Sequence, residues 1–238
     1  MKILSQIKTI AAVVILFLAS NSSFAQEASK NIPVQGFTEV SVSSGIDLYI
    51  TQGTTESLNI RSTSNELLKD IVVEKEGNRI TIKFKNNMSW NRMFKNQSIK
   101  AYLNYKTLNA LRASGGSDVF TQNTLNSNTL SLSASGGADL KMALACKNLT
   151  VEISGGSDAD LSGKTENLNA RSSGGSDLNA FSLSAVNAKV SASGGSDAEV
   201  SVSAALEANA SGGSDITYKG NPSVKKNSSA SGDVRKAG

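Results

Sequence analysis

A five-residue motif, Ser-Gly-Gly-Ser-Asp, recurs through the second half of this 238-residue chain and constrains its fold more than any other feature. The first serines of successive copies stand 18 to 21 residues apart. Copies begin at Ser114, Ser135 (where Ala138 replaces the second serine), Ser154, Ser173, Ser193 and Ser211, and a shortened copy begins at Ser231. A regular period of this length indicates supersecondary units that stack and share one core.

Apolar and polar residues alternate on both sides of the motif. Apolar residues stand five, three and one positions before the first serine, as in Leu149, Val151 and Ile153, and they resume after it, as in Leu161. This period of two predicts half-buried strands. If the alternation runs through the motif, its first glycine and second serine also point inward. Ser172 departs from the pattern at a position where most copies carry an apolar residue.

The polar residues between the strands, such as Lys164 to Asn167, read as turns. One copy therefore predicts a coil that consists of a strand, a glycine-rich bend, a second strand and a polar turn. Stacked coils pair their strands in parallel and bury a shared inner face. We expect an all-β solenoid of about 20-residue coils over 108–218, followed by a degenerate repeat and tail over 219–238. A leucine-rich repeat is excluded because the copies contain no helical segment.

Residues 26–107 are also rich in strand patterns, but these do not repeat. The expected strands are Glu39–Ser43, Ile46–Thr51, Ser57–Arg61, a hairpin of Ile71–Glu74 with Arg79–Phe84, and Ser98–Tyr105, with one helical turn at Asn65–Asp70. We expect this part to continue the solenoid and to close its N-terminal end, because an open end exposes strand edges that invite aggregation.

The N-terminus has the pattern of an export signal. Two lysines precede an apolar run over 10–19, and small residues, Ser23 and Ala25, stand three and one positions before a cleavage point. This pattern predicts a signal peptide over 1–25. The run is shorter than the about 20 residues that span a bilayer, and no later segment is long and apolar enough to do so. We expect an exported protein that is periplasmic, on the outer surface or secreted, without a transmembrane segment after cleavage.

Composition excludes several kinds of chemistry. The chain has no histidine, which removes Ser-His-Asp and Cys-His nucleophiles and His-ligated zinc. Its single cysteine, Cys146, has no internal disulfide partner, and we expect it to be a small buried residue rather than a reactive thiol. Acidic residues outnumber basic ones in the repeats, which argues against nucleic-acid binding because that requires a continuous basic surface.

Stacking places one aspartate of each coil in a file. The members are Asp118, Asp139, Asp158, Asp177, Asp197 and Asp215. Neighbouring strands lie about 4.8 Å apart, so adjacent carboxylates repel by about 0.9 kcal/mol even at the dielectric constant of water. Either serine hydroxyls and backbone N–H groups of the bend satisfy each carboxylate, or calcium bridges them. We favour the first explanation and expect no cofactor.

Residues 88–95 differ in character from the rest of the chain, because they hold its one tryptophan and two of its four methionines. One interpretation is a loop in which Trp90, Arg92 and Phe94 contact a glycan or lipid surface. The other is a flap folded over the core, which we favour because large apolar side chains are usually buried.

A polysaccharide-active enzyme is the alternative to a non-enzymatic scaffold. Two carboxylates can hydrolyse a glycosidic bond. The best candidates are Asp158 with Asp160, or Arg171 flanked by Asp158 and Asp177 in neighbouring coils. The uniform repeats argue against this alternative, because an active site breaks the repeat at one place. Only two aromatic residues precede Tyr218 in the repeats, too few for a sugar-stacking cleft.

Three features of the sequence together resemble a known protein family. They are the segment Ser44-Gly45-Ile46-Asp47, the hairpin after it and the repeated coils. Over roughly 34–218 the chain resembles the bacterial "putative auto-transporter adhesin, head GIN domain" family, with Asp47 where the naming motif has asparagine. The resemblance implies a right-handed β-helix in an exported protein and carries no catalytic residues. We therefore expect a non-enzymatic surface or periplasmic solenoid, adhesin-like or structural, whose partner is a glycan or an envelope or matrix protein.

Overall fold

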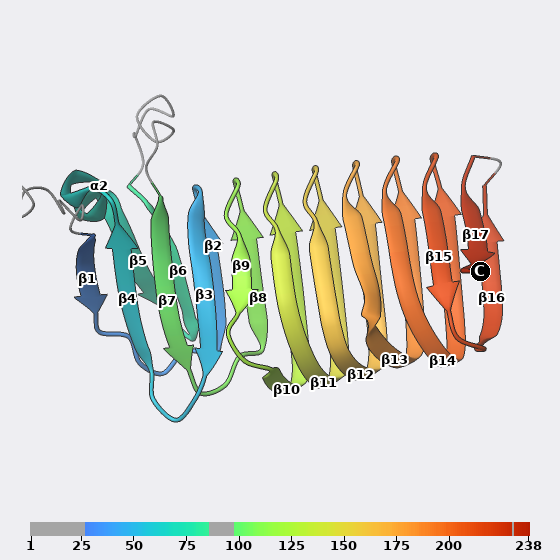
Figure 1. Ribbon diagram of the computed structural model, residues 1–238, viewed down its shortest axis with the longest axis horizontal. Helices are drawn as coiled ribbons and strands as arrows, with labels where there is room; N and C mark the ends of the chain where they lie inside the picture. Colours follow the sequence, from blue (N-terminus) through green and yellow to red (C-terminus); the bar gives the residue numbers. More distant parts are fainter. Residues whose placement is uncertain (1–26, 86–97, 230) are drawn as a thin grey trace, which may run out of the picture.

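The computed structural model describes residues 27–85, 98–229 and 231–238, which form an elongated β-solenoid of about seven turns (Figure 1). The predicted all-β fold is confirmed, with 69% of residues in strands and 3% in helix. Within the described part of the chain, α2 (Asn65–Asp70) is the only helix.

Each repeat contributes one long strand that covers two sides of the solenoid. These strands are β10 (Leu125–Ser135), β11 (Leu140–Ser154), β12 (Ala159–Ser173), β13 (Asp177–Ser193) and β14 (Asp197–Ser211). Of these, β11 to β14 each begin after one glycine-rich bend, run to the opposite edge, turn there and return to the next bend, whereas β10 begins at that opposite edge and a separate short strand, β9 (Val119–Thr121), covers the first side of its coil (Figure 1). Neighbours pair in parallel with like positions opposite each other, so that Leu149 pairs with Leu130 and Leu168.

The predicted turn at Lys164–Asn167 is wrong in one respect, because these residues remain within β12. Lys164 pairs with Ala145 on one side and Ser184 on the other, so the parallel ladder continues around this edge. Pairing with both neighbouring coils supplies hydrogen-bond partners for the backbone, and no independent turn is needed. Three short strands, β15 (Asp215–Lys219), β16 (Ser223–Ser228) and β17 (Asp233–Lys236), complete the C-terminal coils.

The N-terminal coils are stacked out of chain order. β2 (Glu39–Ser43) pairs in parallel with both β6 (Arg79–Phe84) and β8 (Ala110–Ser114). β3 (Ile46–Gln52) likewise pairs in parallel with both β7 (Ile99–Tyr105) and β9 (Val119–Thr121). The first coil of the chain therefore lies between two later ones (Figure 1). Through these parallel pairings the N-terminal strands stack in line with the coils of the repeats.

Antiparallel strands finish the N-terminal end. β4 (Ser57–Ser62) pairs with β7 and with β1 (Ala28–Ile32), and β5 (Ile71–Glu76) pairs with β6. α2 lies at this end of the solenoid, and its Leu67 and Leu68 are buried in the common core (Figure 1). The strand bounds expected from the sequence agree with the observed ones within two residues.

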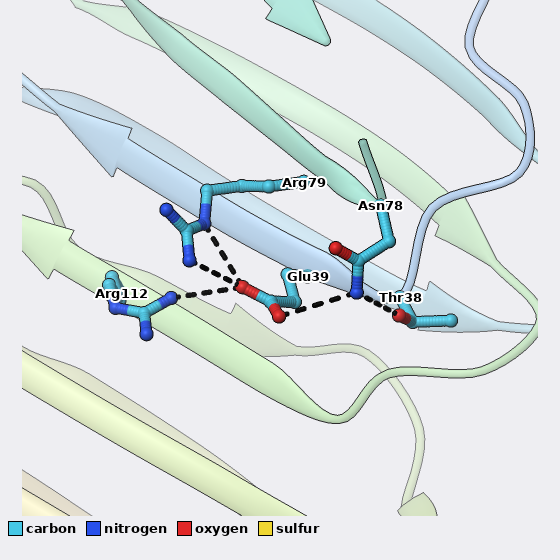
Figure 2. A network of polar contacts seen from close by, with 5 residues as sticks. All are labelled: Thr38, Glu39, Asn78, Arg79 and Arg112. Atoms are coloured by element: carbon cyan, nitrogen blue, oxygen red, sulfur yellow. Dashed lines mark hydrogen bonds and ion pairs between the residues drawn. The ribbon is translucent and has the colours of Figure 1, made fainter. Parts of the chain in front are cut away.

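An ion-pair network joins β6, β2 and β8, the three neighbouring strands whose order in the sheet differs from their order in the chain (Figure 2). Glu39 of β2 accepts hydrogen bonds from Arg79 of β6, at 2.6 and 3.0 Å, and from Arg112 of β8, at 3.2 Å. Asn78 donates to its other oxygen at 3.3 Å. The bond from Arg79 is the main reason that the pKa of Glu39 lies below its ordinary value. Partly exposed pairs of this kind contribute at most about 1 kcal/mol, so the network favours the strand order more than it adds stability.

The core is a continuous stack of the inward side chains predicted from the alternation. Leu149, Val151, Ile153 and Leu161 are all buried, as are most of their counterparts in the other coils, whereas Tyr218 is only partly buried. Cys146 is also buried, as expected, and burial raises the pKa of its thiol. A raised thiol pKa lowers the thiolate fraction, so Cys146 is a poor nucleophile.

Candidate binding surface

The glycine-rich bends form one straight edge of the solenoid. Both glycines of each bend have φ between +60° and +75°, in the left-handed region that glycine adopts at little cost. An added Cβ at Gly174 would lie 3.4 Å from the backbone of Gly155 in the adjacent coil, whereas one at Gly175 would meet open space. Both positions therefore favour glycine because of their backbone conformation, and a side chain at the first would in addition contact the adjacent coil.

The first glycine and the second serine of each motif were both predicted to point inward. The prediction is wrong for the glycine and confirmed for the serine. The second serines are fully buried, whereas Gly174 and its counterparts lie at the exposed edge or close to it. Two consecutive left-handed residues reverse the chain direction, so the glycines form the tip of the bend and the inward alternation resumes at the serine. Ser176 closes the bend, because its hydroxyl accepts the N–H of Ser173 at 3.0 Å and lies 3.2 Å from the carbonyl of Ile153 in the adjacent coil.

The departure at Ser172 has a local explanation. Its buried hydroxyl donates to the carbonyl of Ser176 at 2.7 Å, so a polar side chain is satisfied at an inward position. Buried hydroxyls are stable in a core when they find such partners.

The structure brings all six predicted aspartates into one file and extends it at both ends. Asp47 stands beside Asp118 at the N-terminal end, and Asp233 pairs with Asp215 at the other. Within the file a carboxylate accepts the backbone N–H of the next aspartate: Asp158 N–H bonds Asp139 at 3.2 Å, and Asp177 N–H bonds Asp158 at 3.3 Å. The donors thus belong to the neighbouring coil, whereas we expected them within the bend of each aspartate.

The N-terminal end of the file is its electrostatically strained part. Burial raises the pKa of Asp47, and the charge of Asp118 raises it further, against the opposing effect of Lys100. Burial and the charge of Asp139 likewise raise the pKa of Asp118. Asp47 occupies the bend of the β2–β3 coil, where Ser44, with φ of +71°, takes the place of the first glycine.

Replacing Asp47 with asparagine is expected to stabilise the protein at pH 7 by about 0.5 kcal/mol, after the Coulomb repulsion is reduced for solvent and salt screening. A carboxyl group whose pKa is raised on folding loses stability as pH rises through its folded pKa, so the penalty is present at pH 7 and absent below the unfolded pKa. Urea denaturation at pH 7 and pH 3 measures the difference. An equal effect of Asp47→Asn at both pH values would contradict this explanation.

Removal of calcium is expected to leave the melting temperature unchanged. Inter-coil N–H bonds already reach Asp139, Asp158 and Asp197, and in the described part of the chain no three acidic or cysteine side chains converge as metal ligands. Melting curves of residues 26–238 in EDTA and in millimolar calcium provide the test, because a ligand at a hundredfold excess over its Kd adds about 2.7 kcal/mol. If calcium raises the melting temperature and Asp158→Asn with Asp177→Asn abolishes the rise, the carboxylates bind the ion.

The structure places Arg171 away from the aspartates proposed to flank it. Arg171 bonds Glu152 at 3.2 Å and lies on the strand segment before its bend, whereas Asp158 and Asp177 stand just after theirs. Asp160 accepts a hydrogen bond from Asn179 at 3.0 Å. Trp90, Arg92 and Phe94 lie outside the described residues; the strands that flank them, β6 and β7, end and begin at Phe84 and Ile99.

Sequence reasoning missed an aromatic file on the outer surface. Tyr49 of β3 stacks on Tyr102 of β7, with ring centroids 5.1 Å apart, and on Phe120 of β9 at 5.0 Å. The guanidinium of Arg61 lies 4.8 Å from the centroid of Tyr102. Counting aromatics within the repeats alone gave too low a number, because two of the three rings come from the irregular part. The sequence did contain one signal for this file. Each of the three rings stands at an outward position of the alternation in its strand, beside buried neighbours.

A family model described as "Putative auto-transporter adhesin, head GIN domain" matches residues 36–222. This chain belongs to that family. The head GIN domain match includes the β2–β3 bend and every complete Ser-Gly-Gly-Ser-Asp copy.

Solved structures with this fold include proteins from Bacteroides and Parabacteroides species. A "putative adhesin" from Bacteroides fragilis is 24% identical, with 89% of this chain and 97% of that chain covered and a TM-score of 0.79. A "putative lipid binding protein" from Parabacteroides distasonis is 18% identical with a TM-score of 0.72, and a "putative adhesin" from Parabacteroides merdae is 18% identical with a TM-score of 0.67. Both cover 89% of this chain and at least 96% of their own. At these identities the likeness establishes the head GIN fold alone, and no curated protein sequence matches the chain.

Proposed function

We propose that this head GIN protein is an exported, non-enzymatic, adhesin-like scaffold that binds its partner through repeated outward side chains. The observation that carries the proposal is the alignment of like residues in straight files along a rigid solenoid. Beside the aspartate file runs a file of outward serines, in which each pairs with the next: Ser43, Ser114, Ser135, Ser154, Ser173, Ser193 and Ser211. Identical groups at regular spacing favour multivalent contact with an extended partner.

Export is part of this proposal. It rests on the signal-peptide pattern of residues 1–25, which lie outside the described residues, and on the family description as an auto-transporter adhesin. In the part of the chain that the structure describes, no helix is long and apolar enough to cross a membrane. The mature N-terminus of protein recovered from the periplasm, cell surface or medium is expected at Gln26, and an intact Met1 in the cytoplasm would contradict export.

The partner is a glycan or an envelope or matrix protein. The similar solved structures carry the descriptions "putative adhesin" and "putative lipid binding protein", so glycans, proteins and lipid vesicles are the classes of surface to test. Purified residues 26–238 are to be screened against a glycan array, immobilised collagen and fibronectin, and phosphatidylglycerol vesicles. Saturable binding to a glycan or protein supports the proposal, and binding to none of these surfaces would contradict it.

A further inference from the structure

The coil of β13 is less regular than the coils before it. The ladders that join β10, β11 and β12 keep one register throughout. The ladder between β12 and β13 shifts beside Ser162. The ladder between β13 and β14 shifts between Ala180 and Ser184, and again just before Asn187. Such bulges re-aim side chains and are over-represented next to active sites, so the surface beside Asn187 is where a binding site is expected.

A groove of about 470 Å³ lies at this place and crosses the coils of β11 to β14. Neighbouring strands lie about 4.8 Å apart, so the groove extends for about 14 Å along the solenoid. Its volume falls within the about 300–1,000 Å³ that is typical of ligand pockets. One side is a row of asparagines at equivalent positions of β11, β12 and β13, namely Asn148, Asn167 and Asn187. The other side, two residues later in each strand, consists of Thr150, Asn169, Lys189 and Glu207.

The asparagine row is held by hydrogen bonds between its amides. Asn187 donates to Asn167 at 3.2 Å, and Asn167 donates to Asn148 at 3.0 Å. A side-chain amide has two N–H donors and an oxygen with two lone pairs, so these bonds leave Asn167 one donor and one acceptor site. Asn167 and Asn187 are exposed. The row therefore presents oriented groups, each able to donate and to accept, to a ligand in the groove.

The row ends at the irregular coil. The residue of β14 that pairs with Asn187 is Ala205, which has no amide to donate to the oxygen of Asn187. An asparagine at this position would have continued the row and occupied that oxygen. The end of the row therefore keeps an acceptor for a ligand.

The lining of the groove favours a neutral ligand. Lys189 and Glu207 are its charged residues, and they form an ion pair at 3.2 Å. The lining thus has no net charge, and its remaining polar groups are amides and one hydroxyl.

Sugar hydroxyls match these amides better than a peptide backbone does. An extended peptide presents like-facing amides about 6.6 Å apart, twice the rise of a strand, whereas the asparagines repeat about every 4.8 Å. A sugar hydroxyl both donates and accepts, as each amide of the row does. A pyranose carries hydroxyls on adjacent carbons, so one sugar can bond two neighbouring amides.

We propose that this groove binds a neutral oligosaccharide, whose hydroxyls bond the asparagine row and the facing Thr150 and Asn169. The sugar chain lies along the solenoid and crosses several coils. This inference rests on the proposed function and deepens it, because it names the ligand class and the place where it binds.

The groove is lined by polar groups that water also bonds, so a single groove binds its sugar weakly. Many copies of the protein that face one polysaccharide convert weak single contacts into firm attachment. Polyvalent probes are therefore the appropriate assay.

The test uses residues 26–238 on a biosensor surface and albumin conjugates of cellohexaose, laminarihexaose, mannohexaose and galactohexaose, with polygalacturonate as the anionic comparison. At least one neutral conjugate is expected to bind. Asn167→Ala removes the middle of the row and is expected to weaken that binding about tenfold, equivalent to about 1.4 kcal/mol. Asn187→Ala is expected to weaken it severalfold. Both positions are exposed, so both variants are expected to keep the circular dichroism spectrum of the parent protein.

The matched control is Asn227→Ala, which breaks another exposed amide bond, from Asn227 to Asn209 at 3.1 Å, outside the groove. This variant is expected to bind like the parent protein. Equal binding by Asn167→Ala and the parent, an equal loss in Asn227→Ala, or binding to polygalacturonate alone would each overturn the proposal. If collagen or fibronectin binds while every neutral conjugate fails, the sugar site is wrong and the adhesin-like function stands. Failure of all surfaces removes both.

Discussion

Replacing Gly163 with alanine is expected to destabilise the solenoid by about 3 kcal/mol or more, near the upper end for single substitutions. Gly163 lies in β12 at the edge opposite the glycine-rich bends, with φ of +109°. A Cβ at this position would overlap the carbonyl oxygen of Leu144 in the adjacent coil. Backbone cannot move aside without breaking the parallel ladder that Gly163 forms with Leu144 and Leu183.

The control for this prediction is Gly175→Ala, which carries the conformational penalty without the collision. Gly175 has φ of +71°, and an added Cβ there meets no atom within 4 Å. Its expected cost is about 1–2 kcal/mol, the penalty of a left-handed conformation for an ordinary residue. Urea denaturation of residues 26–238, followed by circular dichroism, compares the two variants. Equal losses of stability would refute the role given to Leu144.

Replacing Leu149 with alanine is expected to lower stability by about 2–5 kcal/mol, because the variant loses buried apolar surface and leaves a cavity. Leu149 is buried in β11 between Leu130 and Leu168 of the two adjacent coils. In a stacked solenoid each coil is stabilised mainly by its neighbours, so the loss affects both interfaces of the coil.

Two comparisons isolate the cause. Thr150→Ala alters the adjacent outward residue of the same strand and is expected to change stability by less than about 0.5 kcal/mol. Ala188 occupies the position equivalent to Leu149 two coils later and is buried, so alanine itself is compatible with the backbone there. If Thr150→Ala costs as much as Leu149→Ala, local backbone effects and not the cavity account for the loss.

The repeats were predictable in detail because their order in space is their order in sequence. Alternation identified Leu149, Val151 and Ile153 as inward residues, and the second serine followed the same parity. The bend itself was predicted, but the first glycine was wrongly expected to point inward, because parity counts residues whereas the bend depends on two left-handed φ values. The position of Gly163 gave no sequence signal, since its necessity arises from contact with Leu144.

The aromatic file illustrates the opposite case. Tyr49, Tyr102 and Phe120 stand far apart in sequence, and their rings stack because β3 lies between β7 and β9. Alternation predicts that each ring faces outward, but it contains no information on which strands are neighbours.

The sequence alone determined the all-β class, the period of the coils, the inward residues and the single file of aspartates, because each depends on local periodicity and on stacking of like units. The tertiary structure alone decided that the first coil stands between two later ones, that Asp47 joins the file, and that three aromatic rings stack on the outer surface. Those features depend on pairing between segments that are distant in the sequence. Residue spacing does not fix the order of these strands; the contacts of the Glu39 network and the shared core do.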